Sequence, residues 1–201
     1  MPILEVKNEH ELIITHECNW NCPYCSENIC EREPLDLEEV FKKIERIPDG
    51  VPVTLSGGEP GMMLENSLLL IINKLKEKRC ELMLNTNGLF IEKYPHLINN
   101  FSYILYHCSE NLDEPIKIYD YENVHHALVL TDENVYKLSK VLYNYPIKWN
   151  IIPASNPEPS NKPVLTYANR MMILKKHHLQ LTEHSKIRLI REKKWNEIVF
   201  L

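Results

Sequence analysis

Three cysteines close together near the start of the chain are spaced to bind a metal centre. Cys18, Cys22 and Cys25 stand in the pattern C-x3-C-x2-C. Cysteine thiolates hold iron–sulfur clusters, and a [4Fe–4S] cluster is normally held by four of them. Three thiolates would leave one iron open, much as a catalytic zinc keeps one position open. The spacing therefore predicts a cluster with a coordination position available for chemistry.

A structural zinc site is the alternative, with His16 as a fourth ligand beside the three cysteines. Structural zinc sites usually take two separated pairs of ligands, so the spacing favours iron and sulfur. The tight clustering also argues against disulfides. The remaining cysteines are scattered, and Cys80 and Cys108 lie in apolar runs, where we expect buried free thiols. Cys30 lies nearer the cluster and is a spare candidate ligand.

A second motif follows about thirty residues later. The apolar run Val51–Ser56 ends in Gly57, Gly58, Glu59 and Pro60. The chain has only five glycines, and three of them fall in this turn. Glycine lets the backbone approach a neighbour or ligand closely. The turn is therefore a candidate ligand contact, with a carboxylate available to accept from a cationic group.

Together, the cysteine pattern and the glycine turn resemble the radical S-adenosylmethionine (radical SAM) superfamily, over about residues 10–153. The resemblance implies a [4Fe–4S] cluster on the three cysteines and SAM chelating the open iron through its amine and carboxylate. It implies that Gly57, Gly58, Glu59 and Pro60 bind the methionyl amino group. An electron from a reductant such as flavodoxin or ferredoxin would cleave SAM to methionine and a 5′-deoxyadenosyl radical, which abstracts hydrogen from a substrate.

The resemblance implies further SAM contacts with residues that follow the strands. Tyr24 corresponds to an aromatic position whose backbone meets the adenine, and Ser109 to one that contacts ribose or carboxylate. Asn85 is polar at the end of the third expected strand. Val129 lies where the family often has G-x-I-x-G-x-x-E beside the adenine. This chain departs from that pattern, with Ala127 and Thr131 for the glycines and Asn134 for the acid.

Alternating strands and helices must position these residues. Apolar runs and helical periodicity predict strands at 11–15, 51–56, 81–85, 103–107, 123–130 and 147–152. They predict helices at 35–47, 64–78, 91–99, 134–144 and 167–177, and a closing strand pair at 186–190 and 197–201. This alternation is typical of a parallel α/β sheet, and with the resemblance it predicts a partial (β/α)6 barrel with outer helices.

The motifs agree with that fold, because the cysteines, the glycine turn and Asn85 each follow a strand. Parallel strands bring such segments together at their carboxyl ends. Substrate candidates are polar residues that could face the interior; of the adjacent His125 and His126, only one can point inward from a strand. The full set of substrate candidates is His107, His125, His126, Asn150 and Arg170.

Composition excludes several classes of protein. The 201 residues predict one domain over 1–201, with a cluster loop at 16–30 and a closing segment at about 154–201. The net charge of −5 gives no footprint for nucleic acid. The start lacks a signal peptide, and the longest apolar stretch is too short to cross a membrane. We therefore expect a cytoplasmic protein without a membrane partner.

The sequence favours a small-molecule or nucleotide-like substrate. No cysteine follows the sixth expected strand, and no leader-peptide-binding segment precedes the cysteines. Ser26 and the compact size are similar to 7-carboxy-7-deazaguanine synthases, in which a hydroxyl residue there helps bind magnesium, but their Lys-Pro-Pro-Ser stretch is missing. The alternatives are an activating or peptide-modifying enzyme that acts on a protein partner and, more remotely, a zinc-stabilised interaction module.

Overall fold

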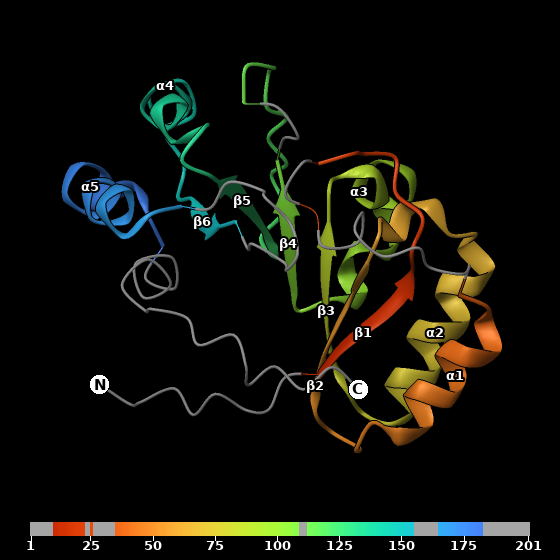
Figure 1. The fold of residues 1–201 in the computed structure, drawn as a ribbon. Helices are drawn as coiled ribbons and strands as arrows, with labels where there is room; N and C mark the ends of the chain where they lie inside the picture. The colour runs from red at the N-terminus through yellow and green to blue at the C-terminus, as the bar shows by residue number, and fades with distance from the viewer. Residues whose placement is uncertain (1–9, 23–24, 26–34, 109–111, 155–164, 183–201) are drawn as a thin grey trace.

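The computed structural model of the chain describes residues 10–22, 25, 35–108, 112–154 and 165–182. Six parallel strands form one open sheet, in which each strand pairs with its neighbours in sequence (Figure 1). This confirms the α/β class and the strand order of a partial (β/α)6 barrel. The strands are β1 (His10–Thr15), β2 (Pro52–Gly57), β3 (Glu81–Thr86), β4 (Tyr103–His107), β5 (Val124–Leu130) and β6 (Asn150–Pro153).

Helices lie between β1 and β2, β2 and β3, β3 and β4, and β5 and β6; among the described residues, none lies between β4 and β5. Because parallel crossovers are right-handed and the strand order never reverses, the helices gather on one face of the sheet. Figure 1 shows α1 and α2 beside β1 and β2, and α4 and α5 at the opposite end, beside β5 and β6. The α-helices are α1 (Leu37–Arg46), α2 (Glu65–Glu77), α3 (Leu89–Lys93), α4 (Leu138–Asn144) and α5 (Tyr167–His177), with short 3-10 turns η2 (Pro60–Met62), η3 (Pro95–Asn100), η4 (Val135–Lys137) and η5 (His178–Gln180).

Alternation along the strands divides the sheet into a helix-covered face and an open face. Alternate strand residues are buried under the helices, such as Leu12 and Ile14 on β1 and Leu82 and Leu84 on β3. The residues between them point the other way. We call this second surface the open face; its half-buried members include Ile13, Met83, Asn85, Tyr103, Leu105, His107 and His125.

Three expected elements differ from the structure, among them the helix expected at 134–144, which is the 3-10 turn η4 followed by α4. The single helix expected at 91–99 is instead α3 followed by the 3-10 turn η3. The break falls at Tyr94, because Pro95 disfavours helical geometry in the preceding residue, whose φ and ψ are −129° and 53°. The strand expected at 147–152 joins β5 only from Asn150, since Trp149 pairs with Leu181 instead.

The closing strand pair at 186–190 and 197–201 lies outside the described residues, as does most of the segment that follows β6. Within the described part of the chain, no helix is both long enough and apolar enough to span a membrane.

Candidate cluster and cofactor site

The three cysteines lie on the segment that follows β1. Cys18 is exposed, whereas Cys22 and Cys25 are half-buried. The backbone N–H of Cys25 donates to the carbonyl oxygen of Cys22 at 3.1 Å, which turns the chain between these two thiols. Burial raises the pKa of the Cys18 thiol, and the charges of Glu59 and Cys25 raise it further. A bound cation would reverse this effect by favouring the thiolates.

The glycine turn is bonded to the first residues of the cysteine segment. The N–H of Gly58 donates to the Thr15 carbonyl oxygen, and the N–H of Glu59 donates to that of Glu17, each at 2.7 Å. A Cβ on Gly58 would lie 2.1 Å from the Glu17 oxygen, and one on Gly57 would lie 2.2 Å from the Thr15 oxygen. Gly57 also has a φ of +117°, which favours glycine. The glycines therefore allow two backbones to meet where the cysteine segment begins.

Glu59 is buried, with 1% of its surface exposed. Four donors reach its carboxylate: the backbone N–H groups of Gly61 (2.9 Å), Phe90 (3.1 Å) and Asn87 (2.6 Å), and the Thr86 hydroxyl (2.8 Å). Burial raises the pKa of the Glu59 carboxyl, and these hydrogen bonds oppose the rise. The carboxylate expected to receive the SAM ammonium thus already joins the turn after β2 to the loop after β3.

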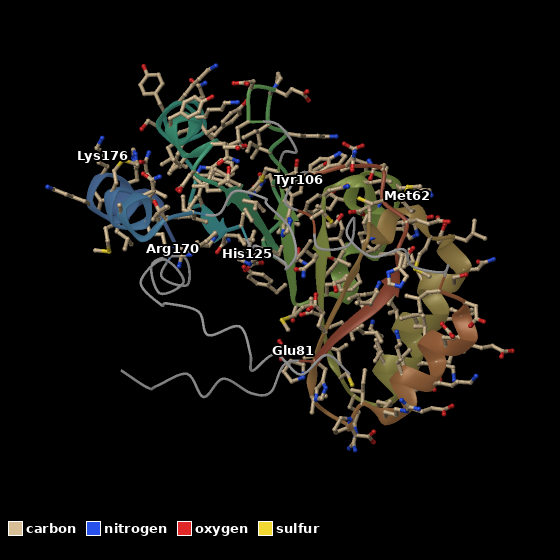
Figure 2. The ribbon with its side chains drawn as sticks, in the orientation of Figure 1. Met62, Glu81, Tyr106, His125, Arg170 and Lys176 are labelled. Carbon is tan, nitrogen blue, oxygen red and sulfur yellow. The ribbon has the colours of Figure 1, made fainter. Side chains whose placement is uncertain are left out.

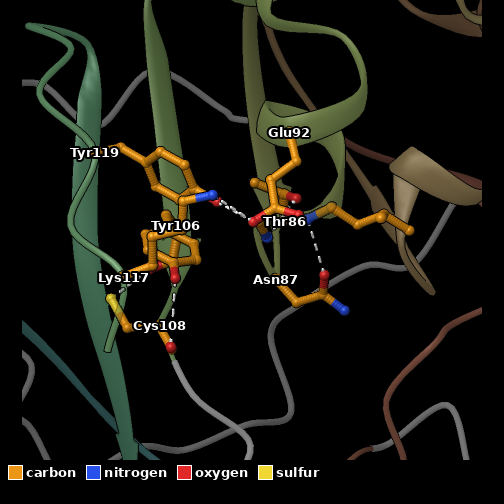
Figure 3. Close-up of polar contacts among 9 residues, drawn as sticks. Thr86, Asn87, Glu92, Tyr106, Cys108, Lys117 and Tyr119 are labelled. Atoms are coloured by element: carbon orange, nitrogen blue, oxygen red, sulfur yellow. Dashed lines mark hydrogen bonds and ion pairs between the residues drawn. The ribbon is translucent and has the colours of Figure 1, made fainter. Parts of the chain in front are cut away.

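Asn87 connects that loop to the cysteines. Its side-chain nitrogen donates to Asn19 Oδ1 at 2.8 Å and to Cys18 Sγ at 3.7 Å. Its side-chain oxygen accepts from the Leu89 N–H at 3.2 Å, as Figure 3 shows. The sequence argument noted Asn85, Thr86 and Asn87 as polar residues at the end of this strand and chose Asn85 as the cofactor contact. The signal available for Asn87 was the Asn87–Gly88 pair directly after a strand, which is typical of a tight loop.

The loop that carries Asn87 rests on an aromatic and charged network (Figure 3). A Cβ on Gly88 would lie 2.8 Å from the ring of Tyr106, which packs edge-on against Tyr119 with the ring centres 4.9 Å apart. Glu92 accepts from the Tyr119 hydroxyl at 2.9 Å and from Lys117 at 2.8 Å, and these two hydrogen bonds lower the pKa of Glu92. These contacts pack against the loop at Gly88 and against the helix α3 that follows it.

The other residues expected to bind SAM are placed in different ways. Asn85 is half-buried on the open face, and Pro60 is buried in η2. The Val129 carbonyl oxygen accepts from the side chain of Asn134 at 3.2 Å, so Asn134 closes the loop after β5. Tyr24 and Ser109 lie outside the described residues, as do Ser26 and Cys30.

Of the substrate candidates, His125 lies on the open face and stacks on Tyr103, with the ring centres 4.1 Å apart (Figure 2). His126 is buried beneath the opposite face, where its Nε2 accepts from the Tyr119 N–H at 3.1 Å. Asn150 accepts from the Thr182 hydroxyl, and Arg170 donates to the Leu165 carbonyl oxygen. The side chains of His126, Asn150 and Arg170 therefore form hydrogen bonds within the fold.

The donor set fits an iron–sulfur cluster. Two N–H groups reach the Cys18 sulfur, from Trp20 at 3.4 Å and from Asn87, and such hydrogen bonds are a feature of cluster sites. Among the described residues, which include His16 and the three cysteines, no three His, Cys, Asp or Glu side chains gather to hold one metal ion. A cubane binds each thiolate to a different iron, so the cysteines need not converge on one point.

The comparison with protein families identifies one superfamily. The model described as Radical SAM superfamily matches residues 12–140. A Methanocaldococcus jannaschii protein that bears the name of a glycyl-radical enzyme activating enzyme is 29% identical over 83 residues, which cover 40% of this chain and 32% of that protein. A protein of Helicobacter pylori named GTP 3′,8-cyclase is 36% identical over 97 residues, which cover 43% of this chain and 29% of that protein. The chain therefore spans about a third of the length of these curated relatives.

The fold is also similar to that of a solved structure, native anSMEcpe with bound AdoMet and Kp18Cys peptide. The TM-score is 0.58 at 15% sequence identity, and the match covers 83% of this chain and 58% of that one. At this level of identity the likeness concerns the fold alone.

Proposed function

The chain belongs to the radical SAM superfamily, and we propose that it cleaves SAM reductively and uses the radical to abstract hydrogen from a small-molecule or nucleotide-like substrate. In this proposal Cys18, Cys22 and Cys25 hold the [4Fe–4S] cluster. When bound, the cluster and SAM would supply a 5′-deoxyadenosyl radical, with one electron consumed and methionine as the other product. A flavodoxin- or ferredoxin-like protein would deliver that electron.

One observation carries the proposal: three loops that follow β1, β2 and β3 are bonded to one another at one edge of the sheet. Gly58 and Glu59 bond to the beginning of the cysteine segment, and Glu59 and Asn87 connect the other two loops. At the turn, Gly57 and Gly58 are partly exposed, whereas Glu59 and Pro60 are buried. We therefore propose that the backbone of the two glycines receives the SAM amino group, and that Glu59 acts by fixing the turn.

The open face would receive the substrate beside SAM. Its half-buried residues combine apolar side chains such as Met83 with the carboxamide of Asn85 and the stacked rings of Tyr103 and His125. Binding sites for small molecules are typically apolar and aromatic surfaces with a few polar groups. The similarity to a GTP 3′,8-cyclase supports a ring-bearing small molecule as substrate. A 7-carboxy-7-deazaguanine synthase-like reaction would also use such a substrate.

The test is anaerobic reconstitution with iron and sulfide, followed by reduction in the presence of SAM. The parent protein should bind iron, give the EPR signal of a reduced [4Fe–4S] cluster and release 5′-deoxyadenosine and methionine. Cys18→Ala should lose all three properties. Cys80→Ala is the matched control, because Cys80 is a buried thiol near the start of β3, at the edge of the sheet away from the proposed site. A parent protein that stays free of iron, or that leaves SAM intact, would refute the proposal.

A protein substrate is the second candidate, favoured by the similarity to the M. jannaschii protein named for glycyl-radical enzyme activation. The two candidates differ in which molecule loses the hydrogen atom, a partner protein or a small molecule. For an activating enzyme, the reduced protein with SAM should generate a glycyl-radical EPR signal on a partner protein. Stoichiometric consumption of a small molecule, without any such signal, supports the first candidate.

A further inference from the structure

We propose that Asn87 is a positioning residue that raises the reduction potential of the cluster by donating a hydrogen bond to the sulfur of Cys18. The inference rests on the proposed function, since it assumes the cluster on the three cysteines. The loop after β3 would then help to set how readily the cluster accepts an electron.

The geometry fixes which way the Asn87 carboxamide points. Its oxygen accepts from the backbone N–H of Leu89 at 3.2 Å, a group that can only donate. A flipped amide would place its nitrogen against that N–H, two donors facing each other. The nitrogen is therefore directed at the cysteine segment, where its two hydrogens serve Asn19 Oδ1 at 2.8 Å and Cys18 Sγ at 3.7 Å.

The backbone of Asn87 is held as firmly as its side chain. Its N–H donates to Glu59 Oε2 at 2.6 Å, and the same carboxylate is buried and also bonded to Thr86 and Phe90. Gly88 follows with a φ of +105°, where a Cβ would meet the ring of Tyr106. A donor held in this way keeps its direction while the charge of the cluster changes.

The expected effect follows from charge. Reduction adds an electron to the cluster and its thiolate ligands, so a donor dipole at a ligand sulfur stabilises the reduced state more than the oxidised state. Hydrogen bonds to the sulfurs are among the factors that set cluster potentials. Because the bond exists in both oxidation states, only the difference in its strength between them shifts the potential, so its loss should lower the reduction equilibrium constant by no more than about tenfold. For a one-electron couple, tenfold corresponds to about 59 mV.

The experiment is a mediated redox titration of the reconstituted protein without SAM, followed by the EPR signal of the reduced cluster. Asn87→Ala should lower the equilibrium constant for reduction of the cluster by up to about tenfold, and the midpoint potential with it. Asn87→Asp should lower it further, because it replaces the donor with a negative charge of the same shape. Asn87→Gln, which keeps the donor, should restore part of the shift. The midpoint is taken from the loaded fraction alone, so partial loss of iron does not obscure it.

Asn144→Asp is the matched control, since Asn144 is exposed at the end of α4, beside the other end of the sheet (Figure 1). It should leave the midpoint unchanged. An Asn87→Ala midpoint equal to that of the parent overturns the inference. A parent protein that holds a cluster but leaves SAM intact refutes the proposed function. The redox titration still tests whether Asn87 raises the midpoint potential. A parent protein without iron overturns both.

Discussion

Replacing Gly58 by alanine is expected to separate the glycine turn from the cysteine segment. A Cβ at this position would lie 2.1 Å from the Glu17 carbonyl oxygen and 2.8 Å from the carbonyl carbon of His16. These are backbone atoms, which cannot turn aside as the end of a flexible side chain can. One of the two backbones must therefore move, and the hydrogen bonds Gly58 N–H to Thr15 and Glu59 N–H to Glu17 lie directly at the point of contact.

The magnitude follows from these contacts. Each backbone hydrogen bond contributes about 0.5–1.5 kcal/mol, and forcing an extra methyl group into a packed site costs about 1–3 kcal/mol. The backbone can relieve part of the clash by giving up the bonds, so we expect the free energy of unfolding to fall by about 2–4 kcal/mol. At about 2–4 °C per kcal/mol for a chain of this size, Tm should fall by about 4–16 °C.

Thermal unfolding of the iron-free protein measures the stability, and iron content after reconstitution measures the site. Gly50→Ala is the control, since a Cβ there meets nothing within 4 Å and costs only the strain of its positive φ, about 1–2 kcal/mol. Both variants should be less stable than the parent, but only Gly58→Ala should also lose iron. A Gly58→Ala protein as stable and as well loaded as Gly50→Ala would refute the reasoning.

Two further predictions concern buried polar groups. Glu59→Ala leaves the buried N–H groups of Gly61 and Phe90 and the half-buried N–H of Asn87 without their acceptor, so denaturant unfolding should show a loss of at least about 2 kcal/mol. A loss below about 0.5 kcal/mol would contradict the bonding described here. Burial lowers the pKa of His126, and its Nε2 accepts from Tyr119, so the neutral ring is the form that the fold favours. The contribution of neutral His126 to the free energy of unfolding is therefore fully present above pH 6.5, the ordinary pKa of histidine. It is lost as the pH falls from there through the lowered pKa of the folded state. His126→Asn should flatten this part of the stability profile, and an unchanged profile would count against the assignment.

The repeating patterns of strands and helices could be predicted from the sequence because they are local. Burial under the helices alternates along β1 and β3, and α1 begins where Asp36 accepts from the Glu39 N–H at 2.7 Å. Placing each motif after a strand was enough to predict which loops would share one edge of the sheet. The family match supports the chemistry expected there.

The partners of individual side chains could not be predicted, because they depend on how separate loops meet. The expectation that Glu59 accepts from a ligand stays a prediction; what could not be predicted is that its carboxylate is buried and bonded to the loop after β3. Asn85 and Asn87 are equivalent in type and differ by two positions. Strand alternation decides the direction of Asn85, whereas Asn87 stands beyond the strand, and only the packed loop places it 3.7 Å from the Cys18 sulfur.

The order of the strands also bears on how the molecule folds. Every hydrogen bond described between the three loops joins residues from 15 to 90, and β1, β2 and β3 pair only along consecutive connections. Contacts between elements that are close in sequence require little loop-closure entropy and form quickly in folding. The three loops of the candidate site can therefore come together early in folding, before β5 and β6 join the sheet.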